Sequence, residues 1–403
     1  MPQPLSSLEA AHAHLLSHAR AVDETETVSL DAALGRILAS DLYVTADVPP
    51  ADNSSVDGYA LCSDDLNGTG VLAVSARIAA GYEGARLIKG TAARIFTGAP
   101  VPSGADTVIM QEDTEQTPEG IRLTGSPTPG QNIRRRGQDL KTGDLALARG
   151  THIRAQEMGL IASLGLAEAP VMRKLRVSVL TTGDELVAPG QPLQPGQIFN
   201  TNGFTLRGLL QQLHCELVMC ETVRDTQEAT AGALEAAAQH SDLVITSGGV
   251  SVGEEDHLRA ILERSGGLSL WRLAIKPGKP LAFGRIHNTP VLGLPGNPAA
   301  VLVAFLILGA PYIRRCQGDT SSAPQGETLP AAFAVDKPSI RREFMRARKE
   351  RIDGQCQVSV FPNQSSGMLS SACWAEGLAV VPEHTTVQPG DLITYYTFTE
   401  LLG

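Results

Sequence analysis

The spacing of apolar positions changes several times along the chain. Between residues 174 and 321, short apolar runs such as those at 177–180 and 243–245 alternate with longer segments of helical periodicity. Strands that alternate with helices of this length are typical of a mostly parallel sheet covered on both faces. The pattern therefore predicts an α/β domain over these residues.

Two other regions have the pattern of β-structure. Residues 48–146 contain short β-type runs separated by turn clusters, which predicts a mainly β domain. Residues 322–403 return to short alternating strands, as in a small β-barrel or sandwich. The α/β region is therefore expected to lie between two β-rich regions.

The segments next to the first β region have a helical pattern. Residues 5–40 look helical apart from an interruption near 25–29, and a capping box at Ser6 and Glu9 indicates where the first helix begins. A further helix is predicted over 155–164. We expect these segments to form helical structure outside the β region.

Composition limits the class of protein. A chain of 403 residues has room for about two to four domains. It is 42% hydrophobic and 19% charged, as is usual for a soluble globular protein. The formal net charge is -10 and no basic tail is present, which argues against nucleic acid and anionic membranes as partners. Any binding of phosphate must therefore be local.

The cysteines and the apolar runs indicate the compartment. None of the six cysteines forms a CxxC pair, a pattern that suits a reducing compartment. The first residues lack the basic region and the long apolar core of a signal peptide. The most apolar run, 299–313, is shorter than the roughly 20 residues that cross a bilayer, so we expect a buried helix there. Together these features predict a cytoplasmic protein.

Polar and glycine-rich loops follow successive strands of the predicted α/β domain. In open α/β sheets, ligands bind outside the carboxyl ends of the strands. Any one such loop is more often an ordinary turn, but their recurrence at one sheet edge favours a binding site. The loop residues are Thr181, Thr182, Gly183, Asp184, Glu185, Asn200, Asn202, Asp225, Ser247, Gly248, Gly249, Val250, Ser251, Asp256, Lys276, Lys279, Pro295, Gly296, Asn297 and Pro298.

Several of these residues have the chemistry of a phosphate site. Gly248 and Gly249 permit a tight turn that brings backbone N–H groups near an anion. Asn297 suits a helix N-cap and Pro298 suits the first helical position, so a helix N-terminus is expected at the same edge. Such a terminus favours phosphate.

Charged residues of both signs accompany the glycines. Lys276 and Lys279 supply mobile positive charge for phosphate groups. The neighbouring acids would repel phosphate unless a hard cation such as Mg²⁺ bridges the two. Glu254 and Glu255 have a simpler role at the start of the next helix, where negative charge is favourable.

A second polar group lies in the predicted β domain. Asp57, Thr97 and Asp139 come from the loops DNSSVDGYA, IFTGAP and RRRGQD. Asp-Gly is a common turn and a run of arginines is commonly a solvated surface. The three residues nevertheless belong to loops of one domain, and we expect them to converge at its mouth.

With both groups in view, the sequence resembles the molybdopterin molybdenumtransferase family, known as MoeA in bacteria and as the gephyrin E domain in animals. The resemblance covers essentially the whole chain and is weakest in the C-terminal part. The stretches that carry it, in the family's order, are DNSSVDGYA, IFTGAPVPSGADTVIMQED, RRRGQDLKTGD, VLTTGDEL, GQIFNTN, DLVITSGGVSVGEEDH, LAIKPGKPLAFG and VLGLPGNPAA.

The resemblance implies a four-part, multidomain subunit of α/β and β structure. Its parts are a discontinuous helical domain (1–47 with 147–173), a mainly β domain (48–146), a molybdopterin-binding α/β domain (174–321) and a C-terminal β-barrel (322–403). It also implies a homodimer in which the β domain of one subunit faces the α/β domain of the other. The two polar groups would then form one cleft.

The implied activity belongs to molybdenum cofactor biosynthesis. Molybdate is inserted into adenylylated molybdopterin, AMP leaves and Mg²⁺ is required. The dithiolene sulfurs are soft ligands that suit a transition metal, and the pyrophosphate-like bond needs its charge neutralised while it breaks. A molybdopterin adenylyltransferase would supply the substrate, and molybdoenzymes are candidate recipients of the product.

The resemblance also assigns roles to individual residues. The implied catalytic set is Asp57, Thr97, Asp139, Glu185, Asp225, Asp256, Lys276 and Lys279, with Glu185, Asp225 and Asp256 as metal ligands. The implied set that binds the pterin and its phosphate is Thr182, Gly183, Asp184, Asn202, Ser247, Gly248, Gly249, Val250, Ser251, Pro295, Gly296, Asn297 and Pro298. Candidates from the C-terminal part are Ser365, Ser366, Ser370, Arg342 and Arg346, although surface ion pairs are the commoner role of such arginines.

Three other functions compete with this interpretation. An adenylyltransferase needs only the central sheet, so the additional parts disfavour it. A non-catalytic scaffold of the same fold, which binds molybdopterin without turning it over, is weakened by the presence of the candidate acids and lysines. A damage-sensing hydrolase with a related sheet is disfavoured by the full run of family motifs. The sequence does not distinguish molybdate from tungstate.

Overall fold

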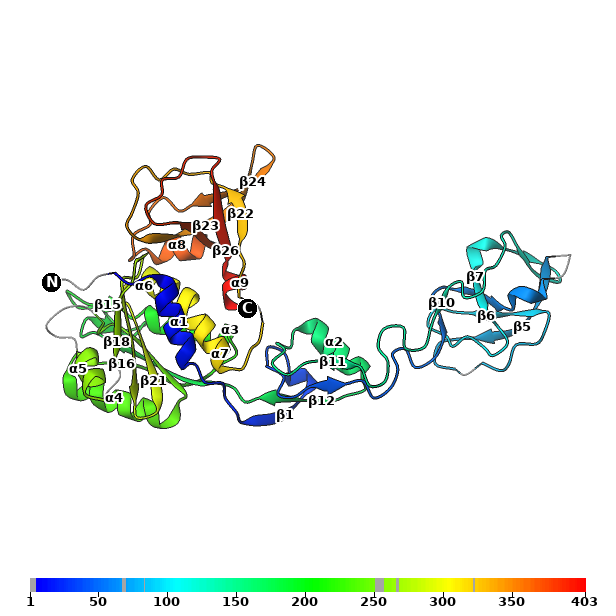
Figure 1. Ribbon diagram of the computed structural model, residues 1–403, viewed down its shortest axis with the longest axis horizontal. Coiled ribbons are helices and arrows are strands. Elements are labelled where there is room, and N and C mark those ends of the chain that lie inside the picture. The colour runs from blue at the N-terminus through cyan, green and yellow to red at the C-terminus, as the bar shows by residue number, and fades with distance from the viewer. Residues whose placement is uncertain (1–4, 67–69, 83, 251–256, 266–267, 322) are drawn as a thin grey trace.

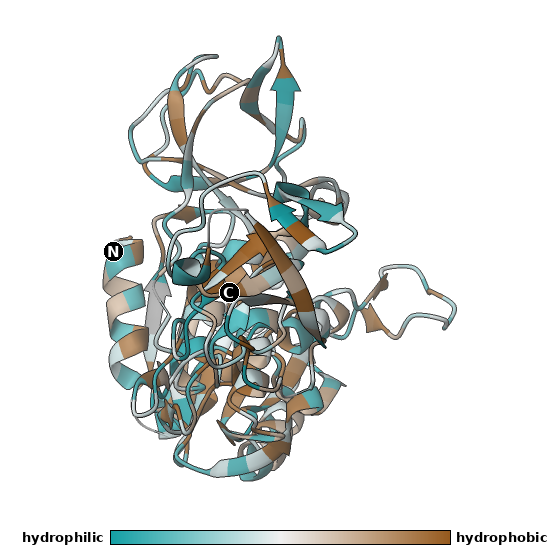
Figure 2. Cartoon of the chain, turned by 90° about the vertical axis from the view of Figure 1, so that its right-hand side faces the viewer, coloured by the Kyte–Doolittle hydropathy of each residue, from teal (hydrophilic) through white to brown (hydrophobic). Residues whose placement is uncertain are grey.

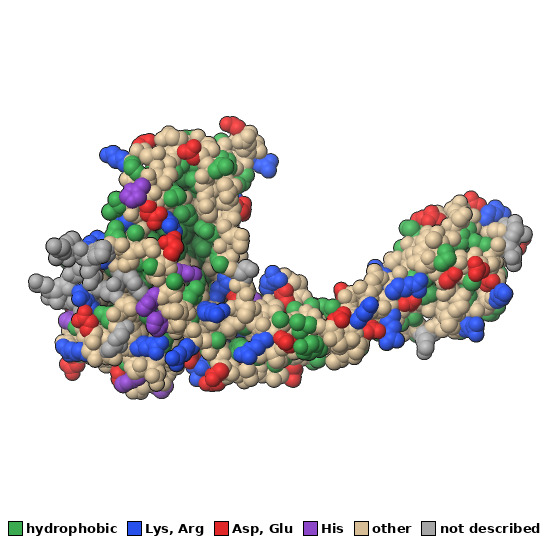
Figure 3. Space-filling view, viewed as in Figure 1, with side chains coloured by type: hydrophobic (Ala, Val, Ile, Leu, Met, Phe, Trp, Pro, Cys, Tyr) green, Lys and Arg blue, Asp and Glu red, His purple; other side chains and the backbone are tan. Residues whose placement is uncertain are grey.

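The chain is elongated and contains several parts of mixed α and β structure (Figure 1). A wide end holds a sheet with helices around it, a narrow arm leads away from that end, and a second sheet lies at the far end of the arm. Figure 3 shows the same outline with side chains, and the arm is its thinnest section. This computed structural model describes residues 5–66, 70–82, 84–250, 257–265, 268–321 and 323–403.

The α/β part, here residues 174–321, is built on a six-stranded sheet in the order β16-β13-β17-β21-β20-β18. The first four strands in this order run parallel, whereas β20 is antiparallel to β21 and β18 is antiparallel to β20. The predicted mostly parallel sheet is therefore confirmed. Its strands are β13 (Arg176–Thr182), β16 (Glu216–Val223), β17 (Leu243–Ser247), β18 (Ser269–Arg272), β20 (Pro280–Ile286) and β21 (Thr289–Leu294), beside the short pair β14 (Leu186–Val187) and β15 (Ile198–Phe199).

Helices cover both faces of this sheet. Val177 and Val179 of β13 pack in one core cluster, and Leu180 packs in another with Leu234 and Leu262, because successive side chains of a strand point to opposite faces. The first cluster includes α1, α3, α6 and α7, and the second includes α4 and α5. The helices are α1 (Leu8–His18), α3 (Asn202–Gln212), α4 (Gln227–His240), α5 (His257–Ser265), α6 (Pro298–Ala304) and α7 (Ala310–Cys316).

Helix α6 continues through a π-helical turn, η4 (Phe305–Gly309), into α7. By length and composition this run is apolar enough to cross a membrane, but 78% of its most apolar window is packed inside the protein. Phe305, Leu308 and Ile313 are fully buried. The predicted buried helix over 299–313 is therefore confirmed.

The helix predicted over residues 5–40 ends at His18, and beyond it the prediction is wrong except for the interruption expected near 25–29. Helix α1 is capped by Ser7, whose Oγ accepts a hydrogen bond from the Ala10 N–H at 3.1 Å, and its buried side carries Ala11 and Leu15. In Figure 2, hydrophobic and hydrophilic residues alternate along the helix next to the N-terminus. Beyond it, Thr25–Ser29 form strand β1, because these residues pair with strand β12, which is far away in the sequence.

The arm consists of residues 19–47 and 137–173, and it is mixed rather than helical. Its strands pair in two antiparallel ladders, β1 with β12 and β2 with β11. Leu38, Ile153 and Ile161 are central members of its own small core. The elements are β1 (Thr25–Ser29), η1 (Leu30–Ala32), β2 (Leu42–Tyr43), β11 (Leu145–Leu147), α2 (Ala155–Ser163) and β12 (Glu168–Met172).

The β part, residues 48–136, confirms the prediction of mainly β structure. Its six-stranded sheet has the order β7-β4-β6-β5-β9-β8. The elements are β3 (Asn53–Ser54), β4 (Gly58–Leu61), η2 (Ser63–Asp65), β5 (Val71–Ile78), β6 (Thr91–Ile95), β7 (Thr107–Met110), η3 (Gln111–Asp113), β8 (Thr114–Thr117), β9 (Gly120–Leu123) and β10 (Ile133–Arg134).

The C-terminal part, residues 323–403, lies against the α/β part (Figure 1). Strand β19 of the α/β part pairs with β23 of the C-terminal part, so one sheet joins the two. The elements are β19 (Ile275–Lys276), β22 (Glu327–Pro330), β23 (Arg342–Ile352), β24 (Gln355–Val360), α8 (Leu369–Trp374), β25 (Gly377–Val381), β26 (Leu392–Thr397) and α9 (Phe398–Leu402).

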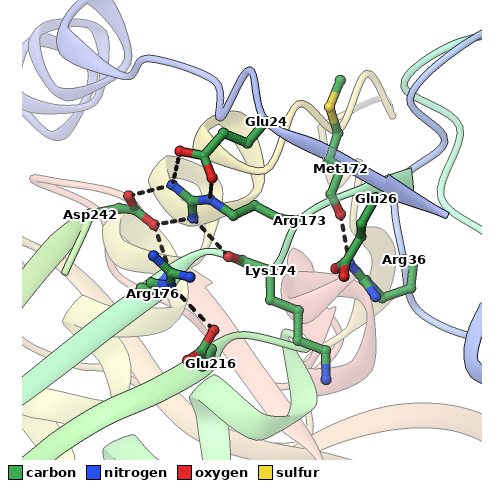
Figure 4. Close-up of polar contacts among 9 residues, drawn as sticks. All are labelled: Glu24, Glu26, Arg36, Met172, Arg173, Lys174, Arg176, Glu216 and Asp242. Atoms are coloured by element: carbon green, nitrogen blue, oxygen red, sulfur yellow. Dashed lines mark hydrogen bonds and ion pairs between the residues drawn. The ribbon is translucent and has the colours of Figure 1, made fainter. Parts of the chain in front are cut away.

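Ion pairs tie the arm to the α/β part where the chain crosses between them (Figure 4). Arg173 pairs with Glu24 at 2.8 Å and with Asp242 at 2.7 Å. Asp242 also accepts a hydrogen bond from the Arg176 N–H at 2.8 Å. The outgoing and returning chains are thus linked to the same loop of the α/β part. The exact limits of the four predicted domains stay a prediction.

Candidate functional site

A cavity of about 820 Å³ opens at the carboxyl ends of the parallel strands. The loops after β13, β17 and β21 surround it, together with residues of the C-terminal part. Of the loop residues predicted from the sequence, it brings together Thr182, Gly183, Glu185, Asn200, Asn202, Asp225, Ser247, Gly248, Gly249, Val250, Lys276, Lys279, Pro295, Gly296, Asn297 and Pro298. Ser251 and Asp256 lie outside the described residues.

The glycine turn after β17 has a conformation that L side chains rarely adopt. Gly248 has φ +97°, and a Cβ placed on it would lie 2.7 Å from the Thr182 carbonyl oxygen. Gly249 has φ +66°. The Gly248 N–H donates to the Leu294 carbonyl at 3.3 Å, so this amide fastens the turn to β21 instead of facing an anion.

Asn202, at the start of α3, connects two loops of the cavity. Its Nδ2 donates to Ser247 Oγ at 2.9 Å and to the Gly296 carbonyl at 2.7 Å. Its Oδ1 is buried and has no hydrogen-bond partner among the described residues. A buried acceptor without a partner is costly, so this oxygen is suited to a donor group of a ligand.

The acids of the cavity occupy two neighbouring loops. Glu185 folds over Gly183, where a Cβ would lie 2.6 Å from the Glu185 Oε2. Asp225 follows β16, and its N–H donates to Asp184 Oδ1 at 3.1 Å. Asp184 does not line the cavity, and this hydrogen bond holds the loop of Asp225 in position. Among the residues that the structure describes, no three His, Cys, Asp or Glu side chains form a metal cluster.

The N-terminus of α6 is already occupied by protein. Pro298 has no N–H, and the Ala299 N–H donates to the Ser366 carbonyl at 2.9 Å. The next amide, at Ala300, donates to the Asn297 carbonyl at 3.0 Å. The amides of Ala299 and Ala300 are therefore bound within the protein, and Gly296 and Asn297 are the residues of this terminus that line the cavity.

The two predicted lysines differ in their surroundings. Lys276 Nζ lies 3.1 Å from both carboxylate oxygens of the buried Glu343, so its charge is largely balanced. Lys279 lines the cavity and makes no ion pair with any residue that the structure describes. Lys279 is thus the better candidate for an incoming anion.

The C-terminal part contributes a wall that the sequence only partly indicated. Ser365 and Ser366 line the cavity as suggested, together with Gln364 and Arg341, which sequence reasoning missed. Ser370 lies in α8, outside this lining. The loop from 364 to 366 is short and polar, so nothing in its sequence sets it apart from a surface turn.

Arg346 lies buried behind this wall. It is 1% exposed, and it donates to Ser371 Oγ and to the Ser365 carbonyl, both at 3.0 Å. Burial lowers the pKa of Arg346 to about 10. No carboxylate among the described residues pairs with it, so its positive charge contributes to the potential at the wall. Arg342, by contrast, forms ion pairs with Glu9 and Glu383.

Asp57 and Thr97 meet at the loops of the β part. Asp57 Oδ1 accepts hydrogen bonds from the Thr97 N–H and hydroxyl, both at 2.8 Å. The Thr97 amide, then its hydroxyl, and also the charge of Arg94 hold the pKa of Asp57 below its ordinary value. Asp57 therefore remains ionised in a mildly acidic medium.

Asp139 is exposed and makes no side-chain hydrogen bond with Asp57 or Thr97 in the described part of the chain. Its backbone N–H donates to the Val48 carbonyl at 3.0 Å. Within one chain, the β part that carries Asp57 and the α/β part that carries the cavity lie at opposite ends of the molecule (Figure 1). The structure thus contains two separate polar sites.

Models of three protein-family regions match successive stretches of the chain. The MoeA N-terminal region (domain I and II) matches residues 6–165. A probable molybdopterin binding domain matches 178–315, and the MoeA C-terminal region (domain IV) matches 328–398.

Relatives of known function and of known structure agree with these matches. The molybdopterin molybdenumtransferase of Haemophilus influenzae is 40% identical over 403 residues, covering 98% of this chain and all of the relative. That of a Nostoc species is 40% identical, covering 89% of this chain and 85% of the relative. A crystal structure of the molybdopterin biosynthesis MoeA protein of Pyrococcus horikoshii superposes with a TM-score of 0.82 at 27% identity, covering 98% and 100% of the two chains. The chain therefore belongs to the MoeA family of molybdopterin molybdenumtransferases, enzymes of molybdenum cofactor biosynthesis.

Proposed function

We propose that this enzyme inserts molybdate into adenylylated molybdopterin with release of AMP. Two dithiolene thiols exchange with one oxygen of molybdate, forming two Mo–S bonds and one water. One water cleaves the bond between the pterin phosphate and the adenylyl group, so the overall reaction neither consumes nor produces water. The observation that carries the proposal is the cavity of about 820 Å³, whose lining combines glycines, acids and two lysines in the fold of this family.

The α/β cavity is proposed to hold the pterin half of the substrate. Asn202 Oδ1 needs a hydrogen-bond donor, and the N–H groups of a pterin are donors of that kind. The Gly248 turn leaves room where any larger residue would meet Thr182. Ser247 and Lys279 lie in the same lining and complete a polar floor for the terminal phosphate.

Glu185 and Asp225 are the described residues that would hold Mg²⁺. Both line the cavity, and a site with two carboxylates fits this ion, which commonly binds through one or two carboxylates and substrate phosphates. When bound, the ion neutralises charge that develops on the phosphates. The two carboxylates would position the ion, and Asp184 keeps the Asp225 loop in place by accepting a hydrogen bond from the Asp225 N–H.

Molybdate is proposed to enter beside the C-terminal wall. Lys279 and the buried, positively charged Arg346 favour a dianion there, and the hydroxyls of Ser365 and Ser366 are hydrogen-bond donors. This wall lies at the start of α6, because the Ser366 carbonyl accepts a hydrogen bond from the Ala299 N–H, and both the wall and the glycine turn line the cavity.

We also propose a cytoplasmic homodimer in which the β part of one subunit covers the cavity of the other. The separation of Asp57 and Thr97 from the cavity within one chain supports this arrangement (Figure 1). A β-barrel is proposed for the C-terminal part, supported by the bridge between Ala331, after β22, and Val358 of β24.

A single-turnover assay tests the proposed function. Purified protein receives adenylylated molybdopterin and Mg²⁺, with and without molybdate, and released AMP and pterin-bound molybdenum are measured. We expect AMP release that depends on molybdate, with molybdenum retained on the pterin. Tight binding of the pterin without AMP release would instead favour the scaffold, and formation of adenylylated product from ATP would favour the adenylyltransferase.

A further inference from the structure

Two arginines of the β part face each other on neighbouring strands. Arg77 of β5 and Arg94 of β6 are direct partners in the strand register. Two positive charges on adjacent strands repel each other. The ion pairs of the β part that the structure describes involve other residues, among them Arg122 with Glu115. The pair therefore keeps its positive charge, at a cost to folding that needs a reason.

An aromatic ring holds both guanidinium groups. The Cζ atoms of Arg77 and Arg94 lie 4.6 Å and 4.8 Å from the centroid of Phe96. Arg94 also lies over Tyr59, and it donates through Nη1 to the Gly58 carbonyl at 3.1 Å. Its Nη2 donates to Gln111 Oε1 at 2.5 Å, which leaves further N–H groups of the fork for a ligand. Stacking on an aromatic face orients a guanidinium without neutralising its charge. The result is a fixed cationic surface, here called the arginine pair.

The arginine pair adjoins the candidate catalytic carboxylate. Phe96 directly precedes Thr97, and Gly58, whose carbonyl binds Arg94, directly follows Asp57. The charge of Arg94 also helps to lower the pKa of Asp57, after the Thr97 amide and hydroxyl. Whatever group reaches Asp57 will therefore be within the electrostatic influence of Arg94.

Resting on the proposed function, we propose that Arg77 and Arg94 bind the phosphate of the adenylyl half of the substrate and hold AMP before it leaves. The cavity of the α/β part already supplies polar groups for the pterin half. A guanidinium fork matches two phosphate oxygens at once, which a lysine does not. The pair thus gives the nucleotide a separate anion site beside Asp57.

Equilibrium binding to the full-length protein tests the assignment. Affinities for AMP, adenosine, inorganic phosphate and molybdopterin are measured by calorimetry for the wild type, Arg77→Gln and Arg77→Gln/Arg94→Gln. The matched control is Arg86→Gln/Arg122→Gln, which removes two exposed charges from the same part of the chain. Because Arg77 is exposed, Arg77→Gln should fold normally. A further variant, Arg94→Lys, keeps the positive charge but removes the planar guanidinium group.

The expected result is a loss that is specific for the nucleotide phosphate. AMP affinity should fall roughly 10-fold in Arg77→Gln and further in the double variant, as for a lost charge-assisted hydrogen bond. The dependence of AMP affinity on salt concentration should also become weaker, a change that a purely structural role of the arginines would not produce. Adenosine and molybdopterin should bind as in the wild type, and the control should bind AMP normally.

Several outcomes would overturn the assignment. The assignment is wrong if AMP affinity is unchanged in the double variant, or if the wild type does not bind AMP. It is also wrong if the control variant loses as much AMP affinity as the double variant. Weaker molybdopterin binding with normal AMP binding would assign the pair to the pterin phosphate instead. If the wild type shows molybdate-dependent AMP release while the double variant binds AMP normally, this inference fails and the proposed function stands. If the wild type never releases AMP, the proposed function fails whatever the binding data.

Discussion

At the scale of single residues, the sequence predicted most of the cavity lining. Gly183, Asn202 and Gly248 were identified because ligands of an open α/β sheet lie at the carboxyl ends of its strands, and these ends can be recognised in a sequence. Arg341 and Gln364 were missed because they come from another part of the chain. No local pattern indicates which distant segment will cover a sheet edge.

The same limit applies at the start of α6. Asn297 and Pro298 are typical of a helix N-terminus and do begin the helix. Whether the first free amide faces a ligand or a protein carbonyl depends on tertiary packing, and here Ser366 occupies it. Local capping rules therefore locate a terminus without saying what binds to it.

Replacing Gly248 tests the geometry of the glycine turn. Gly248→Ala would combine φ +97° with a Cβ 2.7 Å from the Thr182 carbonyl oxygen, whereas Gly190→Ala has a similar φ of +91° in open space. Both should lose about 1 kcal/mol of unfolding free energy for the backbone strain. Only Gly248→Ala should lose more and also bind molybdopterin at least about 10-fold more weakly, since about 1.4 kcal/mol corresponds to a factor of ten.

Denaturant unfolding and equilibrium binding of molybdopterin provide the two measurements. Equal effects of the two substitutions on both quantities would show that the close approach to Thr182 has no part in binding.

At the scale of elements, the alternation of strands and helices predicted the α/β sheet well, because each strand lies beside its helix in the sequence. The arm was predicted poorly. Strand β1 pairs with β12, which is more than a hundred residues away in the sequence. From local periodicity alone, the segment that contains β1 was predicted to be an interrupted helix. Pairing over such a separation leaves no signal in a short window.

The junction between the arm and the α/β part gives a prediction about pH. Burial alone would raise the pKa of Asp242, but Arg173 and the Arg176 N–H outweigh it and hold the pKa below its ordinary 3.8. A lowered folded-state pKa stabilises the fold at higher pH, and that stability is lost as the pH falls below about 4. In Arg173→Gln the main partner is lost and burial raises the folded-state pKa, so this loss of stability at low pH should shrink or reverse.

The unfolding free energy is measured against pH for the wild type, Arg173→Gln and Arg122→Gln. Near neutral pH, Arg173→Gln should be less stable by about 2 kcal/mol, because it leaves a partly buried carboxylate without its partner. Arg122→Gln removes an exposed pair and should change stability by less than about 0.5 kcal/mol. Coincident pH profiles for all three proteins would rule out a structural role for the Arg173–Asp242 pair.

At the scale of the whole molecule, the two polar sites lie at opposite ends of one elongated chain (Figure 1). The alternation of elements predicted each part, but no pattern in the sequence gives the distance between them. The resemblance to the family supplied the idea that they meet across a dimer. In the proposed dimer, Asp57, Arg77 and Arg94 of one subunit would act on substrate bound in the cavity of the other.

The most direct measurement of the central claim uses hybrid dimers. Subunits with Asp57→Asn in the β part are mixed with subunits carrying Asp225→Asn in the α/β part, and hybrids are purified through two different tags. Each homodimer should lose at least roughly 100-fold of its molybdate-dependent AMP release. Each hybrid has one cleft with both changes and one with neither, so it should recover about half the wild-type rate per dimer. Verified hybrids that remain as inactive as the homodimers would contradict an active site shared between subunits.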